Sequence, residues 1–255
     1  MHVDLVTPPR PAQTPPDADA QARVRPSRGG LAGRPDRGRV SFVDLLDASA
    51  RRDLDSLGSL RAIGAGRLAF LQGEHPARVA IVESGLFKLT AEDDAGRTVF
   101  LGLRGSGDVI GLAASWDGSA RSSSATSIGD AVIRMVDSAE FGAFVDRRPS
   151  AARASSRVLA ERIRESVAHR LRMVYAVPER LAHQLLELSA DYGTLLDGGA
   201  VLVELAVTQD DLATMIDASR DSVAKTLMQW RRQQIVETAR RRITILDPRR
   251  LALLP

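Results

Sequence analysis

The stretch from Thr208 to Gln234, TQDDLATMIDASRDSVAKTLMQWRRQQ, predicts two short amphipathic helices joined by a tight turn. Thr208 can cap the first helix, and Asp211 three residues later completes a capping box. Asp217 lies at the turn, and Ser219 is a second N-cap. Two helices arranged in this way can present the polar start of the second helix to the major groove of DNA.

Polar side chains begin the second helix, while apolar residues recur at helical spacing in both. The apolar positions are Leu212, Ala213, Ile216, Val223 and Leu227. The DNA-binding candidates are the outward-facing Ser219, Arg220, Asp221, Ser222 and Lys225, together with Thr208 at the start of the first helix. The fork of Arg220 matches the two acceptors of guanine, and the carboxylate of Asp221 can accept a hydrogen bond from cytosine N4. A simpler interpretation is that Asp221 and Lys225, four residues apart, form a solvated ion pair.

A short β-hairpin is predicted directly after these helices. Residues 235–236 and 243–246 are typical of strands, and the segment between them contains three consecutive arginines. A hairpin that follows a helix-turn-helix is the wing of a winged helix, and Arg241 at its tip can contact phosphate. No Asn-Gly or Asp-Gly pair marks the turn, so the pattern leaves the register open.

Composition limits the class of protein. The chain has 255 residues, of which 44% are hydrophobic, and it has no cysteine. It is long enough for one to three domains, and disulfides are excluded. No apolar run approaches the length of a membrane span and no signal-peptide pattern begins the chain, so we expect a cytoplasmic protein with no membrane partner. Residues 41–149 carry 12 basic and 15 acidic side chains, whereas residues 150–255 carry 16 and 13, which favours DNA contact in the C-terminal part.

The N-terminal half divides into a tail and a β domain. Residues 1–40 are rich in Pro, Gly and Arg, which predicts a disordered tail that is either a plain solvated extension or an aid to DNA binding. Residues 42–60 show a short helical pattern that includes Leu57 and Leu60. Alternating segments punctuated by glycine predict strands at residues 67–71, 79–82, 86–90, 98–103 and 131–136. Residues 41–149 are thus predicted to form a small antiparallel β-roll, or jelly roll.

The periodicity becomes helical beyond Pro149. Apolar residues at three- and four-residue steps predict one long helix over residues 150–177 with a narrow apolar seam. We assign to a dimer contact the seam residues Leu159, Ile163, Val167, Leu171 and Val174. A helix that packs on its own β domain would show a similar stripe. Pro178 is expected to end or kink this helix, and residues 178–255 then form a winged helix-turn-helix domain, so the expected fold class is α+β.

The order of these parts resembles the Crp/Fnr family of bacterial transcription factors over about residues 41–250. Residues 219–223, Ser-Arg-Asp-Ser-Val, are similar to the Ser-Arg-Glu-Thr-Val that begins that family's recognition helix, while Asp217 stands where glycine is usual. Further matches are Glu83-Ser84-Gly85, Gly107-Asp108, Gly111 and Arg121-Ser122. The resemblance implies a homodimer on two-fold-symmetric double-stranded DNA, with RNA polymerase as a further partner. By this resemblance Arg220 and Asp221 read bases, and Lys225 reads a base or holds phosphate.

A ligand pocket in the β-roll is also implied by the resemblance. Members that bind cyclic nucleotides have Gly-Glu followed after about ten residues by Arg-Ser, in which Glu holds the ribose hydroxyl while Arg and Ser hold the phosphate. Here Gly111 is followed by Leu112, whereas Arg121, Ser122 and the adjacent Ser123 remain. The resemblance therefore implies an anion site that lacks the ribose acceptor.

The long helix would complete that pocket. Glu165 and Ser166 stand where the family's cyclic AMP receptor offers two hydroxyl side chains to adenine, and a carboxylate there could accept from an exocyclic amine or lie on the surface. The effector implied is a cyclic nucleotide, either cyclic AMP or cyclic di-GMP. A different nucleotide, or no ligand at all, stays open.

Patterns for catalysis and metal binding are missing from the sequence. The four histidines, His2, His75, His169 and His183, are widely separated, and residues 102–111 contain glycines without Gly-Lys-Ser/Thr. We therefore expect no enzyme, no metal site and no firmly bound cofactor.

Two functions remain. The first is a homodimeric transcription regulator whose β-roll senses a small anionic ligand, an interpretation that Arg121-Ser122 favours. The second is a constitutive or architectural DNA-binding protein with a degenerate pocket, which Leu112 favours.

Overall fold

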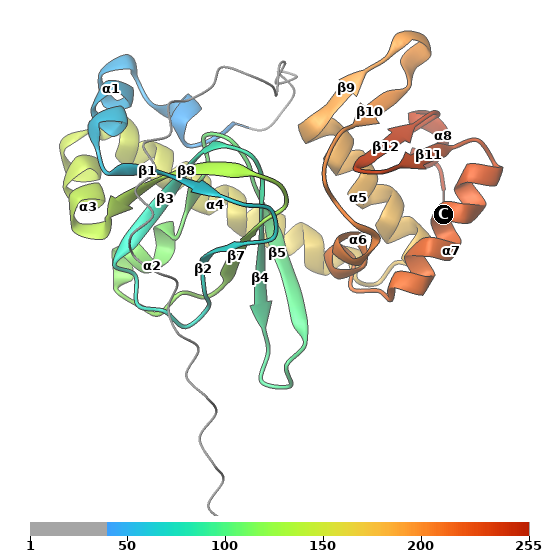
Figure 1. Ribbon diagram of the computed structural model, residues 1–255, viewed down its shortest axis with the longest axis horizontal. Coiled ribbons are helices and arrows are strands. Elements are labelled where there is room, and N and C mark those ends of the chain that lie inside the picture. The colour runs from blue at the N-terminus through green and yellow to red at the C-terminus, as the bar shows by residue number, and fades with distance from the viewer. Residues whose placement is uncertain (1–39, 255) are drawn as a thin grey trace, which may run out of the picture.

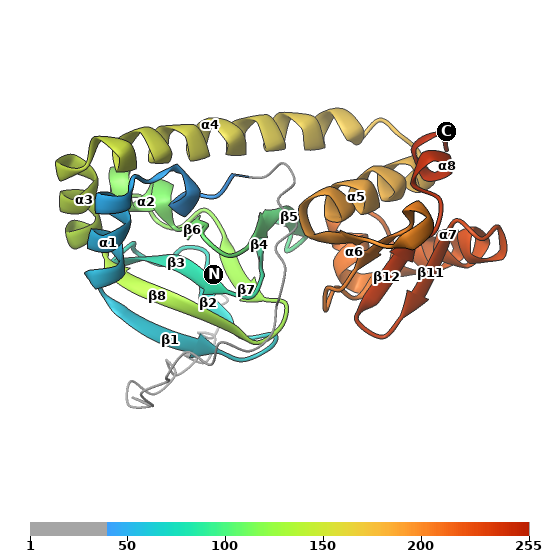
Figure 2. The same cartoon turned by 90° about the horizontal axis from the view of Figure 1, so that it is seen from above.

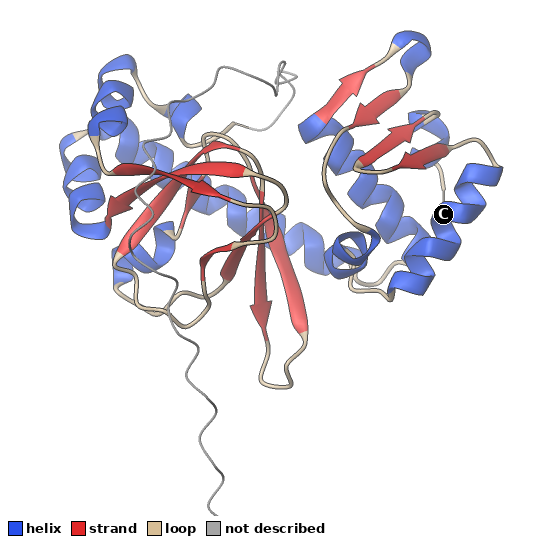
Figure 3. Ribbon diagram, viewed as in Figure 1, coloured by secondary structure: helices blue, strands red, loops and turns tan. Residues whose placement is uncertain are grey.

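The structure is a computed structural model that describes residues 40–254. Apart from Val40, the tail predicted for residues 1–40 lies outside the described residues. A β domain, a long helix and a second domain of helices and strands follow one another along the chain (Figures 1 and 3), and this confirms the predicted α+β class. Within residues 40–254 we find no helix that combines the length and apolarity needed to cross a membrane.

The β domain consists of two antiparallel sheets with short helices at their edges. Its strands are β1 (Ser59–Ile63), β2 (Leu68–Phe70), β3 (Arg78–Ser84), β4 (Phe87–Glu92), β5 (Thr98–Arg104), β6 (Val109–Ile110), β7 (Ser124–Ser127) and β8 (Ala131–Asp137). The sheets have the orders β1-β8-β3-β6 and β2-β7-β4-β5. The accompanying helices are a 3-10 turn (Val43–Leu45), α1 (Ala48–Ser56), α2 (Leu112–Asp117) and α3 (Ser138–Arg147). This is the predicted β-roll.

Strand β3 shows why an uninterrupted apolar run was needed in the middle of this domain. Val79 and Ile81 pack with α1 and α3, whereas Ala80 and Val82 pack between the two sheets. Because successive side chains of a strand point to opposite faces, a strand that is covered on both sides must be apolar at every position. All four residues are at most 2% exposed.

Several boundaries differ from those predicted. The helical pattern predicted to reach Leu60 ends at Ser56, and Leu60 lies in β1. Gly58 causes the break, because it has a φ of 58° and a β-carbon there would collide with the backbone of Met135. The sequence pattern also missed β6 and β7, which are short and, in β7, largely polar.

Helix α4 (Pro149–Arg172) runs along the β-roll and reaches the C-terminal domain (Figure 2). It ends earlier than the predicted residue 177, so Val174 lies in the turn that follows the helix and not on its apolar face, while its part in a dimer contact stays a prediction. Pro178 does not end this helix. It occupies the first turn of the next one, where a missing N–H costs nothing.

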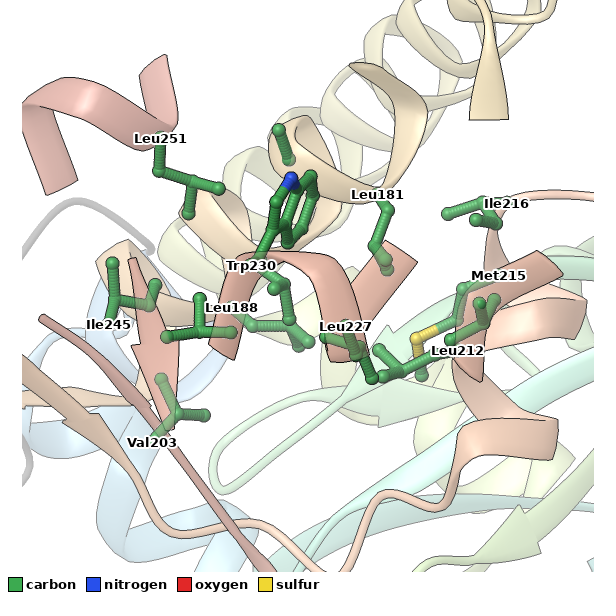
Figure 4. Close-up of a cluster of buried hydrophobic side chains, with 14 of the residues drawn as sticks. Leu181, Leu188, Val203, Leu212, Met215, Ile216, Leu227, Trp230, Ile245 and Leu251 are labelled. Carbon is green, nitrogen blue, oxygen red and sulfur yellow. The ribbon is translucent and has the colours of Figure 1, made fainter. Parts of the chain in front are cut away.

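The C-terminal domain is a winged helix-turn-helix with two additional strands. Its elements are α5 (Val177–Tyr192), β9 (Gly193–Leu195), a 3-10 turn (Asp197–Gly199), β10 (Val201–Val203), α6 (Gln209–Met215), α7 (Arg220–Arg232), β11 (Val236–Ala239), β12 (Arg242–Ile245) and α8 (Pro248–Ala252). Strands β9 and β10, which the sequence pattern missed, extend the wing into a sheet of order β11-β12-β10-β9. Figure 4 shows Trp230 among leucines from α5, α7 and α8, at the centre of this domain's core.

Candidate DNA-binding surface and ligand site

The predicted helix-turn-helix is present, and its caps are those that the sequence indicated. Thr208 and Asp211 form a capping box at the start of α6: the Thr208 hydroxyl accepts a hydrogen bond from the backbone N–H of Asp211, and the Asp211 carboxylate accepts one from the backbone N–H of Thr208. Asp217 adopts the left-handed conformation, with a φ of 49°, at the turn where the family usually has glycine. Ser219 accepts a hydrogen bond from the backbone N–H of Ser222 and so caps α7. The turn therefore forms without glycine.

The first turn of α7 is largely exposed. Arg220, Asp221 and Lys225 are all exposed, while Ser222 is half-buried and its hydroxyl lies 2.9 Å from that of Ser219. The described residues contain no ion pair between Asp221 and Lys225, so the simpler interpretation of these charges as a helix-surface pair is not what the structure shows. Both side chains remain accessible to a partner.

Three arginines form the tip of the wing. Strands β11 and β12 are joined by a two-residue turn, because Ala239 pairs with Arg242 and leaves Arg240 and Arg241 between them. Arg241 has a φ of 61°, so the second residue of the turn adopts the left-handed conformation that glycine most often supplies. All three arginine side chains are exposed, as a contact with phosphate requires.

Arg121 is the centre of the predicted ligand site, and it is buried. Its side chain is 5% exposed, its Nη2 donates a 2.5 Å hydrogen bond to the carbonyl of Arg78, and its guanidinium lies 3.6 Å from the centre of the Phe70 ring. Gly111 has a φ of 85°, which favours glycine, and a β-carbon there would lie 2.4 Å from Nη1 of Arg121. The structure thus brings Gly111 and Arg121 together as predicted.

Two nitrogens of Arg121 lack a partner in residues 40–254. Its Nε and Nη1 are buried and donate no hydrogen bond to any atom of the described residues. Burial lowers the pKa of Arg121, and the nearby carboxylate of Glu74 opposes this only in part. A buried guanidinium with unused donors is costly, because buried charges are normally paired. An anion placed against Nη1 would remove that cost.

The other predicted ligand residues are dispersed. Leu112 has no exposed surface and packs in the core beneath the β-roll, so it is a core residue rather than part of a ligand-accessible surface. Ser122 is exposed and Ser123 is half-buried, both directly after Arg121. Ser166 lies on an exposed face of α4. Of the set predicted from the resemblance, Gly111 and Arg121 alone are shown in direct proximity.

Glu165 has a partner within its own chain. It pairs with Arg104 of β5 at 3.4 Å, and the Arg104 side chain is only 4% exposed. One helical turn earlier, Arg162 donates a hydrogen bond to the carbonyl of Val109, and Val109 lies two residues before Gly111 in the chain. These contacts hold α4 against the β-roll beside the Arg121 site, and they were not predictable from spacing.

A second contact links the β-roll to the helix-turn-helix. Lys88 of β4 donates a hydrogen bond to the carboxylate of Asp211 in α6, and Phe100 of β5 is buried in the hydrophobic core of the C-terminal domain. Figure 1 shows the β4–β5 hairpin standing beside α6. Burial opposes ionisation of Asp211, but hydrogen bonds from Lys88 and Thr208 outweigh it and lower the net pKa of Asp211. The first turn of α6 is therefore held by the β4–β5 hairpin of the β-roll.

We expect Lys88→Met to reduce the free energy of unfolding by about 1–3 kcal/mol, since it leaves a buried carboxylate without its cation while one-third exposure of Lys88 limits the loss. Because the pKa of Asp211 is lowered, this stability is present above its usual value of 3.8 and is lost only as the pH falls below it. Urea unfolding should therefore give the same difference in free energy of unfolding between the native protein and Lys88→Met at pH 5 and at pH 8. Lys225→Met, at the only other lysine, is the control and should be neutral.

Two family models match these domains. Residues 60–148 match the cyclic nucleotide-binding domain, and residues 179–254 match the Crp-like helix-turn-helix domain. A CRP-like cAMP-activated global transcriptional regulator of Mycobacterium tuberculosis is 31% identical over 188 residues, which are 73% of this chain and 84% of that protein. The nitrogen fixation regulation protein FixK of Bradyrhizobium diazoefficiens is 26% identical over 213 residues, which are 82% of this chain and 87% of that protein.

Solved structures share the fold. FixK2 from Bradyrhizobium japonicum has a TM-score of 0.67 at 21% identity, over 76% of this chain and 96% of that chain. The c-di-GMP responsive regulator CLP from Xanthomonas campestris has a TM-score of 0.68 at 18% identity, over 79% of this chain and 100% of that chain. The chain belongs to the Crp/Fnr family of DNA-binding transcription regulators, with a cyclic nucleotide-binding domain ahead of its helix-turn-helix.

Proposed function

We propose that this regulator acts in the cytoplasm as a homodimer that binds a small anionic effector in its β-roll and thereby changes its affinity for a two-fold-symmetric DNA site. Contact with RNA polymerase and the absence of catalytic activity belong to the same proposal. The observation that carries it is Arg121, a buried guanidinium whose Nε and Nη1 have no partner in residues 40–254. A cyclic phosphate would supply the missing acceptors.

The dimer is supported by the apolar face of α4. Ile163, Val167 and Leu171 are 66%, 52% and 66% exposed and recur every four residues, so they line one side of the helix. Leu159 is half-buried against the core of its own β-roll, so it contributes less than predicted to such a seam. A stripe of exposed large apolar residues at this spacing is stabilised when it packs on a second copy of the helix.

The names of the relatives suggest which effectors to test. One relative is described as cAMP-activated and one structural neighbour as c-di-GMP responsive. Leu112 offers no hydrogen-bond acceptor to a ribose hydroxyl, so we expect weaker binding of cyclic AMP than in a site that retains the carboxylate, by roughly ten- to a hundredfold.

A constitutive regulator is the second candidate. Arg162 and Glu165 attach α4 to the β-roll through Val109 and Arg104, by contacts that the chain makes within itself, as a pocket used only as a scaffold would require. In that case the DNA affinity is independent of any nucleotide.

Calorimetric titration with cyclic AMP, cyclic GMP and cyclic di-GMP, with and without DNA selected from random sequence, separates the two candidates. Micromolar or tighter binding that changes the DNA affinity supports the effector-gated regulator. Specific DNA binding that ignores all three nucleotides supports the constitutive one.

We expect Arg121→Ala to weaken binding of the active nucleotide by about 1.5–3 kcal/mol or to abolish it, because a charge-assisted contact with the anion is lost. Arg121→Lys keeps the positive charge but lacks the planar guanidinium with its paired donors, so it should retain part of the nucleotide affinity. Thermal unfolding of both variants checks that the β-roll is intact. Full nucleotide affinity in a folded Arg121→Ala protein would place the effector site elsewhere.

A further inference from the structure

Asp210, which the sequence did not single out, lies beside the arginine that was predicted to read a base. Its Oδ1 is 3.9 Å from Nε of Arg220, and this ion pair joins the first turn of α6 to the first residue of α7. The two side chains are 70% and 65% exposed. An ion pair so exposed adds little to folding stability, so a structural role gives no reason for its position.

The backbone beneath Asp210 is held firmly in place. The adjacent Asp211 is bonded to Thr208 and to Lys88, and the carbonyl of Asp210 accepts a 2.9 Å hydrogen bond from Thr214 Oγ1. Ser219 caps α7 directly before Arg220. Each end of the Asp210–Arg220 pair is therefore attached to a fixed helix start.

The carboxylate of Asp210 faces Nε of Arg220 and not the terminal nitrogens, and this matters for base recognition. Guanidinium carries five N–H groups, and a guanine O6/N7 edge is read by two of them in a parallel fork. When a carboxylate faces Nε, the two terminal Nη groups are left to point forward. An arginine of this length would otherwise sample many rotamers and lose conformational entropy on binding.

We propose that Asp210 is a positioning residue for DNA recognition: it faces Nε of Arg220 and directs the terminal fork of that side chain to guanine. The same carboxylate repels phosphate on every sequence, so it increases discrimination while it reduces non-specific affinity. The proposal rests on the assignment of Arg220 as a base-reading residue.

Asp210→Asn tests the proposal with little change in shape. We would measure binding to the selected DNA, and to versions with each half-site base replaced, at three salt concentrations. Discrimination at the base read by Arg220 should fall roughly two- to fivefold, as expected for the loss of one exposed ion pair. Non-specific affinity should rise at the same time. Asp210→Glu, which retains a carboxylate, should recover part of the discrimination.

Asp197→Asn removes an exposed carboxylate from the β9–β10 connection of the same domain and should leave discrimination unchanged. If Asp210→Asn tightens binding to all sequences by one factor and the ratio between sequences is constant, the carboxylate acts by charge alone and the proposal is wrong. Unchanged binding on every DNA would also contradict it. A parallel Arg220→Ala variant that keeps full discrimination would instead refute the assignment of Arg220, so the two failures are distinguishable.

Discussion

Arg220→Ala is expected to weaken binding to a two-fold-symmetric operator by about 2–6 kcal/mol, because each half-site loses a base contact worth about 1–3 kcal/mol and well-separated contacts add. The loss should be confined to DNA that carries the preferred base at one position of each half-site. Arg220 is exposed at the start of α7 and its capping residue Ser219 is unaffected, so the fold should not change. Competition binding against single-base variants of the operator measures the effect.

Arg241→Ala is the matched comparison, because it removes the same side chain from the tip of the wing. The left-handed backbone at position 241 strains alanine and arginine alike, so we expect the turn to persist and all sequences to bind more weakly by a similar factor, with a smaller dependence on salt. Equal losses on all sequences for Arg220→Ala would contradict its role in reading a base.

Trp230→Ala is expected to destabilise the C-terminal domain by about 3–5 kcal/mol, the usual cost of deleting a large buried aromatic side chain. Trp230 is 2% exposed and packs against Leu181, Leu188 and Leu251 from two other helices (Figure 4). Since α7 contributes Trp230 to this core, DNA binding should be lost together with the folded domain. Urea unfolding followed by circular dichroism gives the change in free energy.

The chain contains a natural control for this experiment. Its other tryptophan, Trp116, is 45% exposed in α2, and Trp116→Ala should change the stability by about 0.5 kcal/mol or less. If both variants were equally stable, the helix-turn-helix core would not depend on the indole ring.

Local patterns were sufficient to predict the helix-turn-helix. The capping box of Thr208 and Asp211, the cap at Ser219 and the apolar positions of both helices involve residues at most four positions apart. The β-roll was also predictable as a class, because its longer strands alternate or, in β3, are apolar throughout. Strands β6, β7, β9 and β10 were missed, since their two to four residues contain too little of a pattern to distinguish them from a loop.

The ligand site was predictable only in part. The pair Gly111 and Arg121 was identified through resemblance, and the structure explains it by the close approach of the Arg121 guanidinium to the glycine backbone. The resemblance could not indicate that Leu112 would pack in the core or that Glu165 would pair with Arg104. Both contacts depend on residues that are distant in the sequence and meet only in the folded chain.

The sequence by itself determined the order of the domains, the caps and faces of the recognition helix, and the basic tip of the wing, because these depend on neighbours along the chain. Only the tertiary structure decided which distant residues meet. Lys88 and Asp211 are 123 positions apart, and Asp210 reaches Arg220 across the turn of the helix-turn-helix. No periodicity encodes such pairs, since they arise from the packing of whole domains and helices whose relative placement depends on many side chains at once.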